Sequence, residues 1–203
     1  MSMGRVNGEW IEMLGSNDAE ERARAAAEIY RVGRAQAELA VRNWWTNPEL
    51  VRLCGAPPTV TVGLAVRPIA FSRIRLANGW PQLAAVPPEQ DAAEFELHFT
   101  GGVLLDVLTT REETGAGAIA RFLAKHAEGV QQVEFRCEDV DRAAAIVQEQ
   151  FGIAAVYPAK RVGANGTKVN FFLVAAPGND KVLIELYEPE RQDAKSGGSF
   201  EIS

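Results

Sequence analysis

Two stretches of this chain repeat one another, and this repeat constrains the fold more than any other feature of the sequence. Residues 101–112 (GGVLLDVLTTRE) overlay residues 180–191 (DKVLIELYEPER), which places Asp106 on Glu185 inside two apolar strands. Two earlier apolar segments also overlay, with Thr61 on Gln132. An internal repeat of this kind indicates two copies of one supersecondary unit.

The predicted elements follow the same order in both copies. The first copy has a strand at 59–66, a helical segment at 69–83, and strands at 95–99 and 103–108 joined by a Gly-Gly turn. The second has a strand at 130–137, a helix capped by Asp139 and ended by Gly152, strands at 168–174 and 182–187, and a turn at 177–180 between them. The sequence therefore predicts an α+β fold of two tandem βαβββ modules. The predicted parts are a helical extension (1–55), a first module (59–110), a linking helix (111–129), a second module (130–189) and a polar tail (190–203).

The N-terminal extension has helical spacing of apolar residues. Asn17 is the predicted cap, and acidic residues gather in the first turn, where the helix dipole favours them. We expect residues 18–45 to form one long helix that packs Tyr30, Val41 and Trp44 against the sheet or against a second subunit. A homodimer formed through these helices is therefore one prediction.

Side chains alternate between the two faces of each predicted strand. In the opening strand of the second copy, one face is apolar and would meet the helix, while Gln132, Glu134 and Arg136 share the other. Glu96 and His98 fall on the corresponding face in the first copy. Two such sheets, curved toward each other, would enclose a polar pocket.

Composition narrows the classes of partner. The net charge of −6 and the pI of about 5.1 argue against a nucleic-acid surface and against attraction to anionic membranes. The two cysteines, Cys54 and Cys137, are too few for a disulfide framework or a zinc cluster. No signal peptide or membrane span is visible, so we expect a cytoplasmic protein with a small-molecule ligand.

The repeated pattern resembles the vicinal oxygen chelate superfamily, which includes glyoxalase I, methylmalonyl-CoA epimerase, extradiol dioxygenases and bleomycin-resistance proteins. The resemblance covers roughly residues 59 to 189. The stretch ARFLAKHAEGVQQVEFRCEDVDRA is also similar to the C-terminal region of 4-hydroxyphenylpyruvate dioxygenase, and VLIELYEP to the strand that carries that family's glutamate ligand.

The resemblance implies a divalent metal held by the opening and closing strands. Its four positions would fall on Thr61, Asp106, Gln132 and Glu185. Iron oxygenases need two imidazoles and a carboxylate, and this sequence has only the glutamate, so we expect no iron and no homogentisate-forming activity. Asp106, Gln132 and Glu185 would hold Mg²⁺, Mn²⁺ or Ca²⁺ weakly, or no metal at all.

Other residues on the polar faces are candidates for chemistry. Glu185, His98 and Arg136 are the candidate catalytic groups. Each also has a purely structural interpretation. His98 would be a structural histidine, and the acids Asp106 and Glu185 would be hydrogen-bonded or paired with Arg136. Candidate substrate-binding residues are Thr61, Glu96, Glu134 and Tyr187.

Three functions remain open from the sequence. The first is a divergent enzyme, of lyase or isomerase type, acting on an oxygen-rich or aromatic metabolite between the modules. The second is a metal-free protein that binds or sequesters a small molecule, as bleomycin-resistance proteins do. The third is a structural protein that dimerises through its N-terminal helices.

Overall fold

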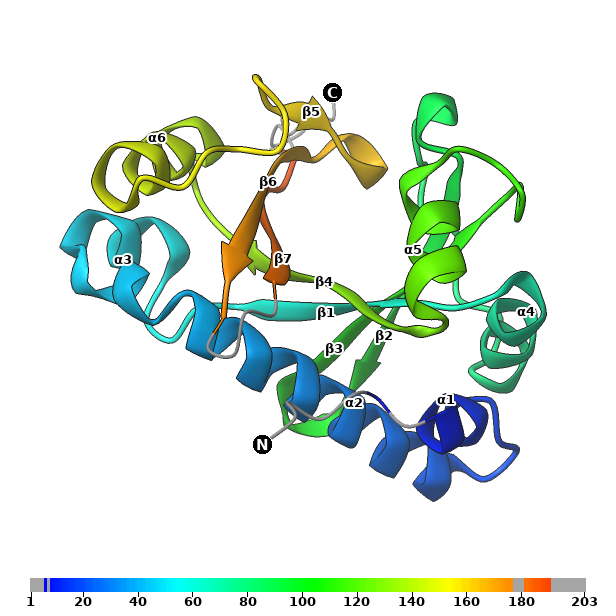
Figure 1. Cartoon of the computed structure of the whole chain (residues 1–203). Coiled ribbons are helices and arrows are strands. Elements are labelled where there is room, and N and C mark those ends of the chain that lie inside the picture. The colour runs from blue at the N-terminus through cyan, green and yellow to red at the C-terminus, as the bar shows by residue number, and fades with distance from the viewer. Residues whose placement is uncertain (1–5, 7, 177–180, 191–203) are drawn as a thin grey trace, which may run out of the picture.

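The computed structural model describes residues 6, 8–176 and 181–190, and it joins both modules in one curled sheet (Figure 1). The strand order is β2-β3-β1-β4-β7-β6-β5. The predicted turn at 177–180 and the tail from residue 191 lie outside the described residues. The strands are β1 (Val60–Ala65), β2 (Ala92–Phe99), β3 (Val103–Thr110), β4 (Gly129–Arg136), β5 (Arg161–Val162), β6 (Lys168–Ala175) and β7 (Lys181–Glu188).

Strand pairing confirms the repeat. In each module the first strand runs parallel to the last, β1 beside β3 and β4 beside β7. Gly63 lies opposite Asp106, and Glu134 lies opposite Glu185, so the two acids occupy equivalent places on equivalent strands. The modules meet where β1 and β4 pair antiparallel. The predicted α+β fold of tandem modules is therefore confirmed.

The first module has one strand fewer than predicted in the described part of the chain. Helix α4 (Pro68–Ala77) ends earlier than the predicted segment 69–83, and the chain then runs to β2 without a strand. One backbone bond, from the Ala84 amide to the Glu94 carbonyl at 3.0 Å, marks where a strand would pair. Three prolines in this stretch, at 81, 87 and 88, explain the difference, because proline has no N–H to donate to a ladder.

The N-terminal extension forms several helices, and residues 18–45 do not make up one of them alone. Helices α1 (Gly8–Leu14) and α3 (Pro48–Cys54) flank α2 (Ala19–Ala40), and the 3-10 helix η1 (Arg42–Thr46) follows α2. Asp18, rather than Asn17, caps α2. The tighter turn after Ala40 brings Trp44 edge-on to Phe172, with ring centroids 5.9 Å apart, and buries it. The predicted single helix over 18–45 is therefore too long by its last turn.

Helix α2 lies across the apolar face of the sheet (Figure 1). Gly33 allows the close approach, because a Cβ atom there would lie 2.5 Å from Cγ1 of Val62. The Tyr30 hydroxyl donates to the Val60 carbonyl at 3.4 Å, and Val41 is fully buried. The apolar face of α2 is thus covered by the chain's own sheet, while dimerisation through these helices stays a prediction.

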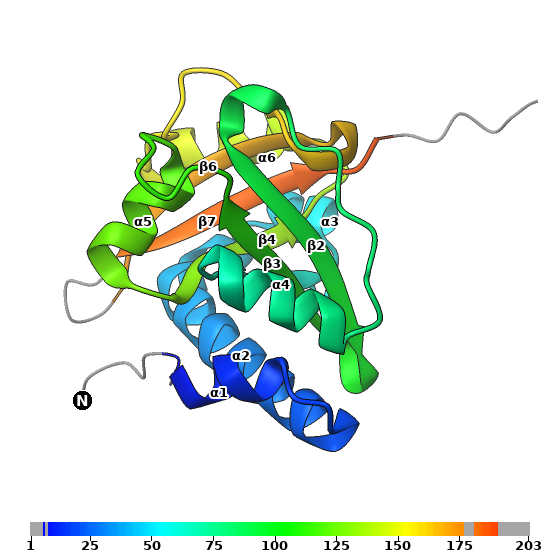
Figure 2. The ribbon, with the colours of Figure 1, turned by 90° about the vertical axis from the view of Figure 1, so that its right-hand side faces the viewer.

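The opposite face of the sheet is hollow and polar. The linking helix α5 (Ala118–His126) packs beside it and, with Ala65, Leu108 and Val86, forms a second small core. Helices α4 and α6 (Val140–Phe151) bury apolar residues in the same core as α2. Figure 2 shows α4 beside β2 and β3 and above α1. In the part of the chain that the structure describes, no helix has the length and apolar character needed to span a membrane.

Candidate functional site

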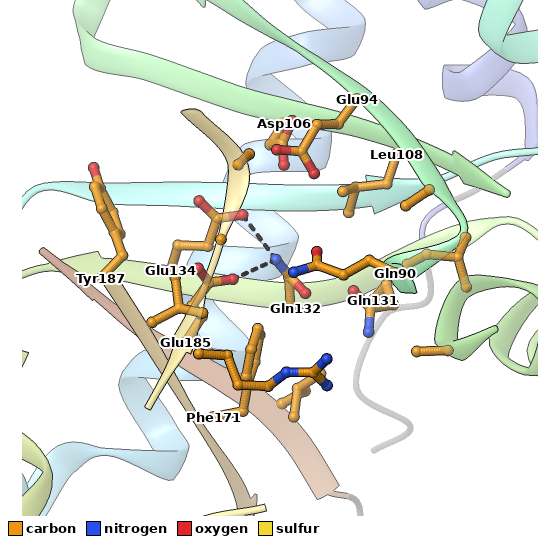
Figure 3. Close-up of a pocket in the computed structure, with 18 of the residues that line it drawn as sticks. Gln90, Glu94, Asp106, Leu108, Gln131, Gln132, Glu134, Phe171, Glu185 and Tyr187 are labelled. Atoms are coloured by element: carbon orange, nitrogen blue, oxygen red, sulfur yellow. Dashed lines mark hydrogen bonds between the residues drawn. The ribbon is translucent and has the colours of Figure 1, made fainter. Parts of the chain in front are cut away.

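A cavity of about 330 Å³ opens on the polar face between the two modules. Strands β2, β3, β4, β6 and β7, helix α5 and the loops on either side contribute to its walls. Acidic side chains are the largest group in the polar lining, and Figure 3 labels four of them. The acids are Glu89, Glu94, Glu96, Asp106, Glu134 and Glu185.

Gln132 holds two of these acids in place. Its Nε2 donates to Oε2 of Glu185 at 2.7 Å and to Oε1 of Glu134 at 3.1 Å (Figure 3). The Gln132 side chain passes over Gly63, where a Cβ atom would lie only 2.5 Å from its Cγ. Glycine at position 63 therefore makes room for the amide that joins Glu134 and Glu185.

Asp106 is a buried acid, and one of its carboxyl oxygens has no hydrogen-bond partner among the described residues. Only 6% of the residue is exposed, and the oxygen without a partner is Oδ1. Burial raises the pKa of Asp106 well above its ordinary value, and the nearby carboxylates, Glu94 first and then Glu134, raise it further. Asp106 is thus an acceptor that only a ligand, a water molecule or its own proton can satisfy.

The other carboxyls are also difficult to ionise. Burial, and then the charge of Glu96, raises the pKa of Glu94 to about 7. Burial raises the pKa of Glu134 to about 8 despite the bond from Gln132. Burial, Glu134 and Glu94 raise the pKa of Glu185 in the same direction. Near neutral pH, several of these groups therefore carry protons and can donate hydrogen bonds.

Tyr187 forms the side of the cavity nearest to Thr61. Burial raises the pKa of the Tyr187 phenol to about 12, opposed in part by a hydrogen bond with Thr61. Thr61 is itself buried and is not part of the cavity lining. Its link to the lining is the hydrogen bond with Tyr187.

The structure brings most of the predicted site residues together. Glu96, Asp106, Gln132, Glu134, Glu185 and Tyr187 all line the cavity. His98 and Arg136 were predicted on its walls but lie outside the lining. Each is at or next to the end of its strand, whereas the lining ends two residues earlier, at Glu96 in β2 and at Glu134 in β4. His98 is exposed and pairs with Glu96 at 2.9 Å. Arg136 does not serve as the partner of Glu185, since Gln132 fills that role.

Sequence reasoning missed part of the lining. Glu94 could have been found, because it shares a strand face with Glu96 by simple alternation. Tyr157 lies in a loop with no periodic signal, yet it packs edge-on against Phe171, with centroids 5.9 Å apart. The Arg161 guanidinium stacks over the Tyr157 ring at 4.6 Å. These three residues form an aromatic and cationic wall opposite the first module.

A set of hydrogen bonds ties the two modules together across the cavity. The Asn165 amide donates to the Ala85 carbonyl at 3.0 Å, and the Ala85 amide donates to Oδ1 of Asn165 at 2.9 Å. Nε2 of Gln90 donates to the Val162 carbonyl at 2.7 Å. We call these three bonds the clasp. Asn165 adopts a positive φ of 52°, which asparagine tolerates better than most residues.

The residues at the four positions implied by the resemblance do not fit an iron oxygenase centre, which needs two imidazoles. Thr61 bonds to Tyr187, and Gln132 presents its amide nitrogen to the carboxylates. Within the described residues, no three His, Cys, Asp or Glu side chains form a group that could hold a metal ion. A weak oxygen site made of Asp106, Gln132 and Glu185 would include the amide oxygen of a glutamine, so the absence of such a group does not test it. This site stays a prediction.

The chain is similar in structure to known methylmalonyl-CoA epimerases. No protein-family model matches the chain, and no curated protein matches its sequence. The solved methylmalonyl-CoA epimerase of Mycobacterium tuberculosis is 29% identical with a TM-score of 0.52, over 64% of this chain and 87% of that one. A variant of the Streptomyces coelicolor epimerase, in complex with 2-nitronate-propionyl-CoA, is 26% identical with a TM-score of 0.51, over 64% of this chain and 96% of that one.

A third match supports the fold alone. A hypothetical protein from Bacillus halodurans is 23% identical with a TM-score of 0.52, over 66% of this chain and 94% of that one. The local similarity to 4-hydroxyphenylpyruvate dioxygenase stays a prediction. The paired modules, their shared sheet and these matches together make the chain a divergent member of the vicinal oxygen chelate superfamily.

Proposed function

We propose that this protein binds a small organic molecule with an aromatic part in the cavity between its modules. The observation that carries the proposal is the cavity, which has a volume of about 330 Å³ and is lined from both modules. Pockets of this size, with a few convergent polar groups and perturbed carboxyls, are the usual sites of small ligands.

The two sides of the cavity suit two parts of such a ligand. Tyr157 and Phe171 offer ring surfaces, which favour an aromatic or apolar body. Asp106, Gln132 and Glu134 offer polar atoms on the other side (Figure 3). Binding without chemistry is the simpler proposal, because two of the three candidate catalytic groups, His98 and Arg136, lie outside the lining, and the third, Glu185, accepts a hydrogen bond from Gln132.

The Streptomyces coelicolor epimerase structure is a complex with 2-nitronate-propionyl-CoA. In this chain, a substrate with a free carboxylate would meet the acids around Asp106, and like charges repel strongly in a cavity of low dielectric constant. We therefore favour a neutral or cationic ligand. The second candidate is a weakly bound Mg²⁺, Mn²⁺ or Ca²⁺ at Asp106, Gln132 and Glu185, which the unpartnered Oδ1 of Asp106 favours.

A thermal-shift screen of metabolites and metal salts tests the proposal, because a ligand stabilises the folded state by mass action. The variant Leu183→Trp fills the cavity from β7, and Ile69→Trp adds the same side chain to the exposed face of α4. We expect stabilising compounds to act on the wild type and on Ile69→Trp but not on Leu183→Trp. Compounds that stabilise all three proteins equally would contradict the proposed site.

A further inference from the structure

The acidic lining has a shortage of positive charge that a ligand can correct. Six acids line the cavity, and the cationic side chains among its described lining residues are Arg121 and Arg161. Arg121 donates to the Ala116 carbonyl, and Arg161 stacks over the Tyr157 ring. Both cations therefore already have partners outside the acidic cluster.

The shortage is sharpest at Asp106. Its Oδ1 is buried and has no partner among the described residues, while the nearest charged groups are other acids. The Gln132 amide, which lies between these acids, already donates to Glu134 and Glu185. A buried acceptor left without a donor is costly, so a ligand that brings donors to Asp106 gains free energy that other ligands do not.

We infer that the ligand of this cavity carries a protonated amine, which binds at Asp106 beside Glu94, and an apolar or aromatic body that lies against Tyr157 and Phe171. This inference rests on the proposed function and names the chemical class of its ligand. An ammonium group has three donors and one positive charge, and both match a carboxylate that has one unpartnered oxygen and is surrounded by acids. In Figure 3 the Glu94 and Asp106 carboxyls lie on one side of Gln132, with Glu134 and Glu185 on the other.

The size of the cavity separates an amine from a metal ion. Its volume of about 330 Å³ suits a molecule of several carbon atoms, whereas an ion needs ligands gathered around one point. No group of three acids, histidines or cysteines in the described part of the chain is gathered in this way. The aromatic wall would also have no role for a bare ion, but it can cover the body of an organic cation.

The test compares ligands that differ only in the polar head. Isothermal titration calorimetry would measure phenethylamine, tyramine and benzylamine against the alcohols with the same skeletons and against phenylacetate and benzoate. We expect the amines to bind roughly tenfold more tightly than the alcohols, about the effect of one charge-assisted hydrogen bond, and the carboxylates not to bind. The chlorides of Mg²⁺, Mn²⁺ and Ca²⁺ form a further arm.

Two substitutions locate the effect. Asp106→Asn keeps the shape of the side chain and removes its charge, so it should weaken the amines by about tenfold and leave the alcohols unchanged. Glu149→Gln, on the exposed side of α6, removes one charge far from the lining and should change neither class. The apo form of each variant is checked by thermal unfolding, so that loss of binding is not confused with loss of fold.

Each outcome decides the matter. Tighter binding of amines, lost in Asp106→Asn, supports the inference. Equal or tighter binding of alcohols or carboxylates, abolished by Leu183→Trp, overturns the amine but retains the proposed cavity function. Binding of the metal salts alone overturns both the amine and the organic ligand, and supports the second candidate, the weak metal site. Binding of no probe at all also overturns both.

Discussion

Ionisation of Glu134 is costly in the folded protein, and replacing it with glutamine isolates that cost. Burial raises its pKa from 4.5 to about 8. Since each pKa unit corresponds to about 1.4 kcal/mol, the full cost of ionisation is roughly 5 kcal/mol. Water in the cavity recovers part of it, so we expect Glu134→Gln to stabilise the unliganded protein by about 2–3 kcal/mol at pH ~9.

The pH dependence has a definite sign. Because Glu94 and Glu134 hold their protons more tightly in the folded state, the folded state binds more protons than the unfolded state between their ordinary and raised pKa values. Stability must therefore fall as the pH rises through this window, from about 5 to about 8. Below about pH 4 both states are protonated, and the effect disappears.

Urea unfolding at about pH 5 and pH 9 measures both effects. The wild type should lose stability between the two pH values, Glu134→Gln should lose less, and the exposed Glu149→Gln should follow the wild type. Suppose that wild-type stability rises over this range, or that Glu134→Gln is equally destabilising at both pH values. The reasoning about a costly carboxylate would then be wrong.

The remaining predictions concern the elements that build the cavity. Asn165→Ala removes the side-chain acceptor of the clasp. The Ala85 amide should then exchange with deuterium about tenfold faster, while the free energy of global unfolding changes by only about 1 kcal/mol. Unchanged exchange would show that the clasp does not hold the modules together. Deletion of residues 1–55 should expose the apolar face of the sheet that α2 covers and cause aggregation; a truncated protein that stays monomeric and equally stable by light scattering and thermal unfolding would contradict this packing.

The architecture could be predicted because the repeat is a long-range signal. Asp106 and Glu185 overlay in sequence and occupy equivalent strand positions, since the pairing of Gly63 with Asp106 is repeated by Glu134 with Glu185. The cap and stop of α6 were also predictable, because Asp139 accepts from the Arg142 amide and Gly152 adopts the left-handed conformation. Local chemistry and global fold agree at these positions.

The details of the cavity were not predictable from alternation alone. Alternation gives the face of a strand, but not how far along the strand a cavity extends, so His98 and Arg136 share the correct pattern and still lie outside the lining. The missing strand of the first module depends on three prolines whose effect shows only once the neighbouring strand is placed. The aromatic wall at Tyr157 comes from a loop, where no period exists to be read.

The absence of imidazoles at Thr61 and Gln132 and the excess of acids around the cavity have the same consequence, which is negative charge without a cation to balance it. In the superfamily pattern a metal ion neutralises the ligands, but here Thr61 and Gln132 are neutral and the site has no group of three metal-binding acids, histidines or cysteines among the described residues. The acids that remain can be accommodated only by protonation, which the raised pKa values of Glu94, Asp106 and Glu134 reflect, or by a positive charge from outside. A core built for stability alone would replace such groups with apolar side chains. Their presence around a cavity, at a cost to folding, is explained when a cationic ligand supplies the missing charge.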